Sequence, residues 1–247
     1  RTTCGRHCNV IAYSCMAKGR RSRTLMQYDI DNIIDLTKRN NVNLDITHRC
    51  PLACERCQRF TSFTSRGLKV PGHDMTLEEF DKVMRFFTHL NFCGQVSDPV
   101  HHPKFIEILA KIREFNELRP RAVKPKSSSV HHASAAKPMK WYPKAFDANP
   151  DTRWWFGIDG FPKDSHKYRT NQDGEKLFEI MKLARKHLKR KPYWQYIVFS
   201  FNENDIDACH QMAKDIDVDF MVVNSSRWLS GADPLRPTIK HALDLNE

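Results

Sequence analysis

Three cysteines, Cys50, Cys54 and Cys57, lie within eight residues of one another. This spacing allows one loop to present all three thiolates to a metal centre. A structural zinc site usually has four protein ligands, whereas three thiolates on a cubane iron–sulfur cluster leave one iron open to another molecule. The sequence therefore predicts a metal centre at these three residues. Zinc completed by His48 or by a more distant residue is the alternative to a cluster.

The other cysteines carry less information. Cys4, Cys8 and Cys15 lie in a basic segment without further motifs, and we expect no functional role for them. Cys93 and Cys209 are expected to be small buried hydrophobic side chains. The first 25 residues lack the apolar centre of a signal peptide, and no apolar run is long enough for a membrane helix. We therefore expect a soluble, cytoplasmic protein with reduced thiols and no membrane contact.

The net charge of +11 arises from two stretches of the chain. Residues 1–28 contain six basic and no acidic residues, and residues 118–146 contain seven basic and no acidic residues. These stretches account for more than the whole net charge, so the rest of the chain is close to neutral. A nucleic-acid partner would bind there, although solvated surface charge is the commoner explanation of such runs.

Strands and helices are expected to alternate around the cysteines. Residues 42–46 read as a strand that ends directly before Cys50. Thr76 and Glu79 form a capping box ahead of an amphipathic helix. His131 and His132, at the end of the expected third strand, could contact a substrate, but ordinary loop histidines are the preferred interpretation. The other expected elements are strand 91–94, a helix with Pro103 in its first turn, strands 127–131 and 154–158, helix 175–188, strand 193–201, a helix capped by Asn202 that runs to about residue 216, and strand 218–223.

This alternation predicts an α/β fold with parallel strands and right-handed crossovers. Six units that curl without closing form a partial (β/α)6 barrel, whose active site lies at the carboxyl ends of the strands. We expect a basic segment with little structure at 1–28, the barrel at 29–230 and a C-terminal tail at 231–247.

The segment from Cys50 to Cys57 resembles the CxxxCxxC signature of the radical S-adenosylmethionine (radical SAM) superfamily. Its position after a strand fits that resemblance, and residues 44–49 look like the family's usual approach to the first cysteine. The resemblance covers approximately residues 42–223.

Three later segments match the same family in the same order. The segment from Gly94 to Pro99, followed by His102-Pro103, resembles the family's glycine-rich, acidic, proline segment. Ile158-Asp159-Gly160 resembles the fourth-strand segment near the SAM ribose, and Tyr168-Arg169 continues the match.

The resemblance implies that Cys50, Cys54 and Cys57 hold a [4Fe-4S] cluster and that SAM binds the fourth iron. It implies that Asp98 orients the amino group of SAM by a charge-assisted hydrogen bond, and that Asp159 contacts the ribose. The reduced cluster would cleave SAM, and the resulting 5′-deoxyadenosyl radical would abstract hydrogen from a substrate. An electron donor such as flavodoxin or ferredoxin is the implied partner. The substrate and the catalytic residues that act on it are not identified.

The sequence also departs from the family pattern. Arg56 stands where an aromatic residue commonly packs near adenine, and Ser97 stands where a second glycine is frequent. No cysteine follows Cys209, so a C-terminal auxiliary cluster is not expected. The alternative function is a nucleic-acid-binding module in which the cysteines bind a structural metal and the two basic stretches contact phosphates.

Overall fold

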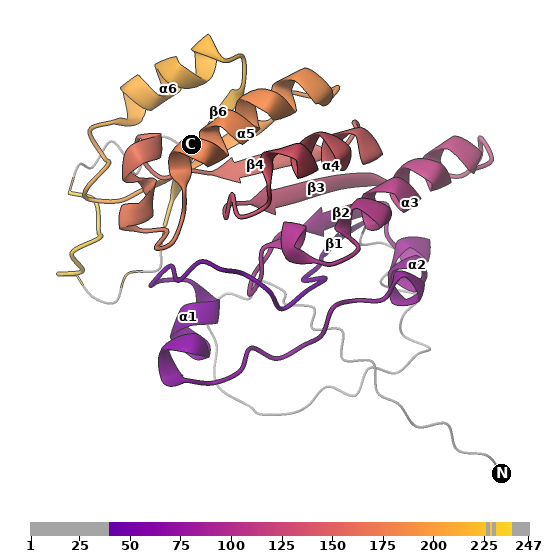
Figure 1. Ribbon diagram of the computed structural model, residues 1–247, viewed down its shortest axis with the longest axis horizontal. Helices are drawn as coiled ribbons and strands as arrows, with labels where there is room; N and C mark the ends of the chain where they lie inside the picture. The colour runs from indigo at the N-terminus through magenta and orange to yellow at the C-terminus, as the bar shows by residue number, and fades with distance from the viewer. Residues whose placement is uncertain (1–39, 226–227, 229–230, 239–247) are drawn as a thin grey trace.

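The computed structural model describes residues 40–225, 228 and 231–238 (Figure 1). Six parallel strands form one sheet in the order of the chain. The basic segment expected at 1–28 lies outside the described residues, as does the end of the expected tail. The strands are β1 (Asn41–Asn43), β2 (His89–Phe92), β3 (Ser127–His132), β4 (Arg153–Gly157), β5 (Tyr193–Val198) and β6 (Asp219–Asn224).

The described helices connect these strands. The second to fifth of these helices contact one another in chain order, and Figure 1 shows them along one side of the sheet, apart from the short first helix. None of the described helices is long and apolar enough to span a membrane. They are α1 (Gln58–Ser62), α2 (Leu77–Phe86), α3 (Phe105–Leu118), α4 (Tyr142–Ala148), α5 (Gly174–His187) and α6 (Ile206–Asp215), with short 3-10 helices that include η3 (Pro99–His101) and η5 (Pro162–Lys167).

The expected α/β fold and partial barrel are confirmed. In the described part of the chain β1 and β6 are the two edges of the sheet, so the barrel is open. Because all six strands run in parallel, their carboxyl ends meet at one edge. The loops that leave this edge carry the three clustered cysteines, Asp98 and Asp159.

The hydrophobic core lies between the sheet and the helices. Alternate strand residues point toward the helices and are fully buried, as the two-residue period of a strand requires. The opposite face of the sheet is only half-buried and forms the inner wall of the open barrel. Large core side chains are Leu90, Phe92, Val130, Trp154, Phe156, Trp194 and Tyr196.

The capping box is confirmed. The Thr76 hydroxyl accepts from the Glu79 amide at 3.1 Å, and the Glu79 carboxylate accepts from the Thr76 amide at 2.8 Å. The second strand runs from His89 to Phe92, two residues earlier than expected. It ends before Gly94, whose left-handed φ of 58° places that residue in the following loop.

Three other sequence expectations are corrected. Asn202 does not cap α6, whose N-cap is Asp205. The Asn202 side chain instead accepts from the Phe199 amide and donates to the Ile197 carbonyl, which closes the turn after β5. Pro103 lies before α3, which begins at Phe105. Helix α4 was not expected, since its seven residues are too few to show a periodic apolar pattern.

Candidate active site

The three clustered cysteines lie on the loop between β1 and α1, which we call the cysteine loop (residues 50–57). All three are free thiols and line one cavity of about 520 Å³ at the carboxyl edge of the sheet. The Cys57 amide donates to the Cys54 carbonyl at 3.0 Å, and the Ala53 amide donates to the Thr170 carbonyl at 3.1 Å. The first bond stabilises a turn within the cysteine loop, and the second joins the loop to the segment after β4.

The thiols share the cavity without crowding together. Among the described residues no three His, Cys, Asp or Glu side chains are grouped closely enough to hold one metal ion. A single zinc ion needs its ligands in one shell at about 2.0–2.3 Å, whereas a cubane binds each thiolate at a different iron. Three thiolates are one fewer than a closed structural zinc site usually has, and they are the number that a cubane with one open iron requires.

Burial keeps two of these thiols neutral in the metal-free protein. It raises the pKa of Cys50 to about 12, with a further contribution from the charge of Asp98. It raises the pKa of Cys54 to about 11, although the charge of Arg169 opposes the shift. Metal binding to these residues must therefore displace protons.

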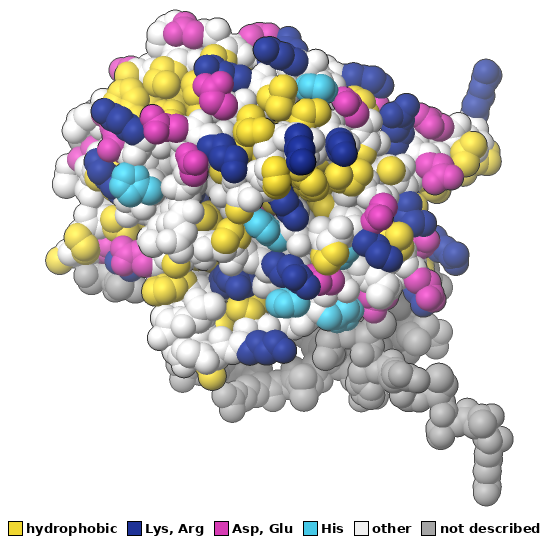
Figure 2. All heavy atoms as spheres, in the orientation of Figure 1, with side chains coloured by type: hydrophobic (Ala, Val, Ile, Leu, Met, Phe, Trp, Pro, Cys, Tyr) yellow, Lys and Arg dark blue, Asp and Glu magenta, His cyan; other side chains and the backbone are white. Residues whose placement is uncertain are grey.

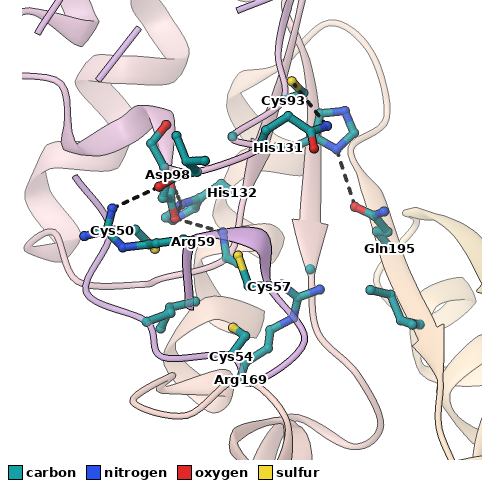
Figure 3. Close-up of a pocket in the computed structure, with 18 of the residues that line it drawn as sticks. Cys50, Cys54, Cys57, Arg59, Cys93, Asp98, His131, His132, Arg169 and Gln195 are labelled. Atoms are coloured by element: carbon teal, nitrogen blue, oxygen red, sulfur yellow. Dashed lines mark hydrogen bonds and ion pairs between the residues drawn. The ribbon is translucent and has the colours of Figure 1, made fainter. Parts of the chain in front are cut away.

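The loop after β2, residues 94–98, forms the next part of the cavity wall. The Ser97 hydroxyl donates to the Asp45 carboxylate at 2.8 Å, and the Asp98 amide donates to the Arg49 carbonyl at 2.9 Å. The Arg59 guanidinium donates to the carbonyls of His48 and Val96. Arg59 thus bridges the approach to the cysteine loop and the 94–98 loop, as Figure 3 shows.

Asp98 lies on the cavity wall, but its side chain is only 4% exposed. Its carboxylate accepts from His132 Nδ1 at 3.0 Å and from the amides of Ala133 and Ser134 at 3.1 and 2.9 Å. It also accepts from the Val100 amide at 3.3 Å, which caps η3. Burial opposes ionisation, but His132 and these amides outweigh it and hold the pKa of Asp98 well below its usual range.

The second predicted binding residue, Asp159, lies behind the cavity rather than on its wall. It is completely buried and forms an ion pair with Arg169 at 2.8 Å. Arg169 itself lines the cavity beside Cys54. Burial works against its charge, yet the charge of Asp159 raises the pKa of Arg169, so it stays a cation. Gly157 makes room for this guanidinium, because a Cβ there would lie 2.7 Å from it.

An apolar cluster packs beside the cysteine loop. Leu52, Cys54, Tyr168 and Phe199 are its buried members. The ring centroids of Tyr168 and Phe199 lie 4.2 Å apart, and both residues line the cavity. The cavity therefore has an apolar wall close to the thiols.

The far side of the cavity is polar and uncharged. Figure 3 shows Cys93, His131 and Gln195 away from the clustered thiols. His131 Nδ1 lies 3.4 Å from Gln195 Oε1, and burial lowers the pKa of His131, so its ring is neutral at pH 7. The Asn91 side-chain amide, also on this wall, donates to the Asn43 side chain at 2.8 Å.

Two residue interpretations were wrong at this site. His131 and His132 are the last residues of β3 rather than loop residues, and both line the cavity. Cys93 is half-buried and faces the cavity, so it is not a core side chain, whereas Cys209 is fully buried as expected. The position of these residues at strand ends is the sequence signal that would have identified them.

The placement of charged side chains bears on the alternative of a nucleic-acid partner. Figure 2 shows basic and acidic side chains interspersed over the visible face. Within the basic stretch at 118–146, Lys126 is buried and its ammonium donates to the Phe87 carbonyl at 2.8 Å. Part of that charge run therefore stabilises the fold.

Solved structures with a similar fold are radical SAM enzymes. Streptococcus suis SuiB matches with a TM-score of 0.60 at 12% identity, over 87% of this chain and 48% of SuiB. Methylornithine synthase (PylB) matches with a TM-score of 0.56 at 9% identity, over 86% of this chain and 66% of that enzyme. A radical SAM methyltransferase from Sphaerobacter thermophilus matches with a TM-score of 0.55 at 10% identity, over 83% of this chain and 62% of that chain.

At these identities the likeness establishes the fold, the open barrel of radical SAM enzymes. SuiB has been crystallised bound to S-adenosylmethionine and to its precursor peptide SuiA. This chain spans about half the length of SuiB. A scan against protein-family models and a search of curated proteins give no match.

Proposed function

We propose that this chain is a radical SAM enzyme in which Cys50, Cys54 and Cys57 hold a [4Fe-4S] cluster. The observation that carries the proposal is the meeting of these three free thiols with Asp98 and Arg169 in one cavity at the carboxyl edge of an open parallel barrel. When bound, the cluster supplies the electron that cleaves SAM and starts radical chemistry on a substrate. The fold shared with radical SAM enzymes supports the proposal.

Different residues of the cavity would bind the amino group, the carboxylate and the adenine of SAM. The 94–98 loop and the charge of Asp98 favour the amino group of SAM on one side of the thiols. The cationic Arg169 favours its carboxylate on the other side, because a guanidinium matches a carboxylate in shape and charge. The Tyr168 and Phe199 rings give an apolar wall on which an adenine can pack. Asp159 acts through Arg169, by holding its guanidinium at the cavity wall.

The polar side of the cavity is left for the substrate. His131, Gln195 and Asn91 line it with neutral hydrogen-bonding groups. The substrate itself is not identified, and the proposed reductant is a low-potential protein such as flavodoxin or ferredoxin. Such a partner is in keeping with a cytoplasmic enzyme.

Anaerobic reconstitution with iron and sulfide tests the proposal. We expect Cys50→Ala, Cys54→Ala and Cys57→Ala each to lose the cluster, since two thiolates leave a cubane underligated. The matched control is Cys93→Ala, which removes a thiol from the same cavity but outside the cysteine loop. It is expected to keep its iron and sulfide. Wild-type iron content in all three cysteine-loop variants would contradict the proposal.

The second measurement is SAM cleavage without substrate. Reconstituted protein with dithionite and SAM is expected to form 5′-deoxyadenosine slowly. Reductive cleavage would release methionine and a 5′-deoxyadenosyl radical without the true substrate, and the radical would then take a hydrogen atom from the buffer, the reductant or the protein. Chromatography quantifies the product. A fully loaded cluster that gives no product with several reductants would indicate a protein that binds SAM without cleaving it.

A further inference from the structure

A buried chain of hydrogen bonds runs from α4 through β3 to the cavity wall. The Tyr142 hydroxyl lies 3.1 Å from His132 Nε2, and His132 Nδ1 lies 3.0 Å from the Asp98 carboxylate. Tyr142 is completely buried, and His132 and Asp98 are at most 3% exposed. Three hydrogen-bonding side chains in a core position need a reason, because each costs free energy to desolvate.

The donor and the acceptor in each of these hydrogen bonds can be assigned by starting from Tyr142. The protonated Tyr142 hydroxyl lies 3.1 Å from His132 Nε2, where it can donate its proton to that ring nitrogen. Burial raises the pKa of Tyr142 far above neutrality, so the phenol keeps that proton. An imidazole that accepts at Nε2 carries its own proton at Nδ1, and it donates this proton to Asp98.

The inner end of the chain holds the 94–98 loop. Asp98 is the last residue of that loop, and its Oδ2 atom accepts from His132 and from the amides of Ala133 and Ser134. The carboxylate therefore joins the end of β3 to the loop after β2. Without the His132 donor only backbone amides would hold the carboxylate.

We propose that His132 and Tyr142 are positioning residues for the SAM site. Tyr142 fixes the Nδ1–H tautomer of His132, and His132 fixes the ionised Asp98 carboxylate that anchors the 94–98 loop. This inference rests on the proposed function, because it takes that loop to be a segment that binds SAM. Neither residue contacts SAM in this scheme.

The tautomer is measurable without any cluster. In ¹⁵N-labelled, metal-free protein, two-bond ¹H–¹⁵N correlation spectra are expected to show His132 protonated at Nδ1 only. His132→Asn identifies its resonances by their absence, and Tyr142→Phe is expected to weaken the preference for that tautomer. An Nε2-protonated or doubly protonated His132 in the wild type would overturn the proposal. This result is independent of whether the protein binds iron.

The effect on SAM is measured by titration of the reconstituted protein, well below its unfolding temperature. We expect His132→Leu to bind SAM about ten- to a hundredfold more weakly. This fold-change corresponds to the free energy that a hydrogen bond to a buried charge contributes. His132→Asn is expected to recover most of the affinity, because its side-chain amide can replace the Nδ1 donor. Iron content should be unchanged in both variants.

The matched control is Ser128→Ala. Ser128 lies on the same strand and forms a buried hydrogen bond with Thr152 at 2.8 Å, but at the end remote from the cavity. It is expected to lower stability and to leave SAM affinity unchanged. Equal SAM affinity in His132→Leu and wild type, or equal weakening in His132→Leu and His132→Asn, would refute the positioning role. Failure of the wild type to assemble a cluster would instead refute the proposed function.

Discussion

The charge of Asp98, on the wall of the cavity that the cysteines line, depends on its neighbours. Asp98 is buried, yet its carboxylate receives one imidazole and three backbone donors. Four donors satisfy the lone pairs of a carboxylate, which is how a buried anion becomes tolerable. The same bonds join two loops, so Asp98 contributes to stability as well as to the electrostatics of the cavity.

Asp98→Asn is therefore expected to lower the free energy of unfolding at pH 7 by about 2–4 kcal/mol, since an amide group would face several N–H donors. The folded-state pKa of Asp98 is lowered. The ionised Asp98 carboxylate therefore contributes fully to the free energy of unfolding above about pH 4, the pKa of Asp in the unfolded chain. This stabilisation is lost as the pH falls toward the lower pKa of Asp98 in the folded protein.

Urea unfolding of the metal-free wild type and variant at a series of pH values measures this difference. The two proteins are expected to differ at pH 7 and to converge as the pH is lowered from about 4 toward 2. A stability difference that stays constant over that range would show that the carboxylate charge is not what stabilises the fold.

The cysteine loop could be predicted from the sequence, because the spacing of the thiols is local information. The role of His132 could not. His132 and Asp98 are 34 residues apart, and only the parallel pairing of β2 with β3 brings them together. Arg169 was noted only as part of a family match, since its ion pair with Asp159 depends on the turn formed by η5.

At the scale of elements, the 94–98 loop depends on one backbone conformation. Gly94 has a φ of 58°, and a Cβ at this position would lie 2.2 Å from the Ser97 carbonyl oxygen. The obstruction is backbone, so a side chain at residue 94 must displace the loop. Gly67 has a similar φ of 66° with nothing within 4 Å of a built Cβ.

These two glycines form a matched pair. Gly67→Ala is expected to cost about 1 kcal/mol, from left-handed backbone strain alone. Gly94→Ala is expected to cost more, about 2–4 kcal/mol, and to weaken SAM binding at least tenfold in the reconstituted protein, because the loop moves. Thermal unfolding and SAM titration measure the two effects. Equal losses in both variants would show that the close approach to Ser97 is not important.

Strongly periodic elements were predictable, and short ones were not. The apolar spacing of α5 and the capping box of α2 appear in the sequence and in the structure. Residues 116–150 contain α4, which has only seven residues and a proline in its first turn. Its buried side chains are determined by packing against α3 and α5, which no local pattern reveals.

At the scale of the whole molecule, the described part of the C-terminal segment, residues 231–238, packs against the cysteine loop. The Arg56 guanidinium donates to the fully buried Asp233 carboxylate at 3.1 and 3.3 Å. The Ser200 amide donates to the Leu235 carbonyl, and the Thr238 hydroxyl donates to the Glu203 carboxylate. The segment thus joins the first and the fifth units of the barrel.

This arrangement gives Arg56 a different role from the aromatic residue common at that position in the family. Its side chain is only 11% exposed and points to Asp233. The expected boundary between a barrel and a separate tail at residue 231 remains a prediction, but residues 231–238 contact the cysteine loop. Two distant parts of the chain are therefore coupled through one buried ion pair.

A double-mutant cycle of Arg56→Met, Asp233→Leu and the combined variant measures this coupling. Each single variant removes one partner of this ion pair while the other charge stays buried, and it is expected to lose about 3 kcal/mol of unfolding free energy. The double variant removes both charges and should lose less than the sum of the single losses, with an interaction energy of about 1–3 kcal/mol. Urea unfolding of the metal-free protein gives these values, and limited proteolysis should cut the C-terminal segment faster in both single variants. Additive losses with unchanged proteolysis would mean that the segment stays bound to the cysteine loop through its other contacts.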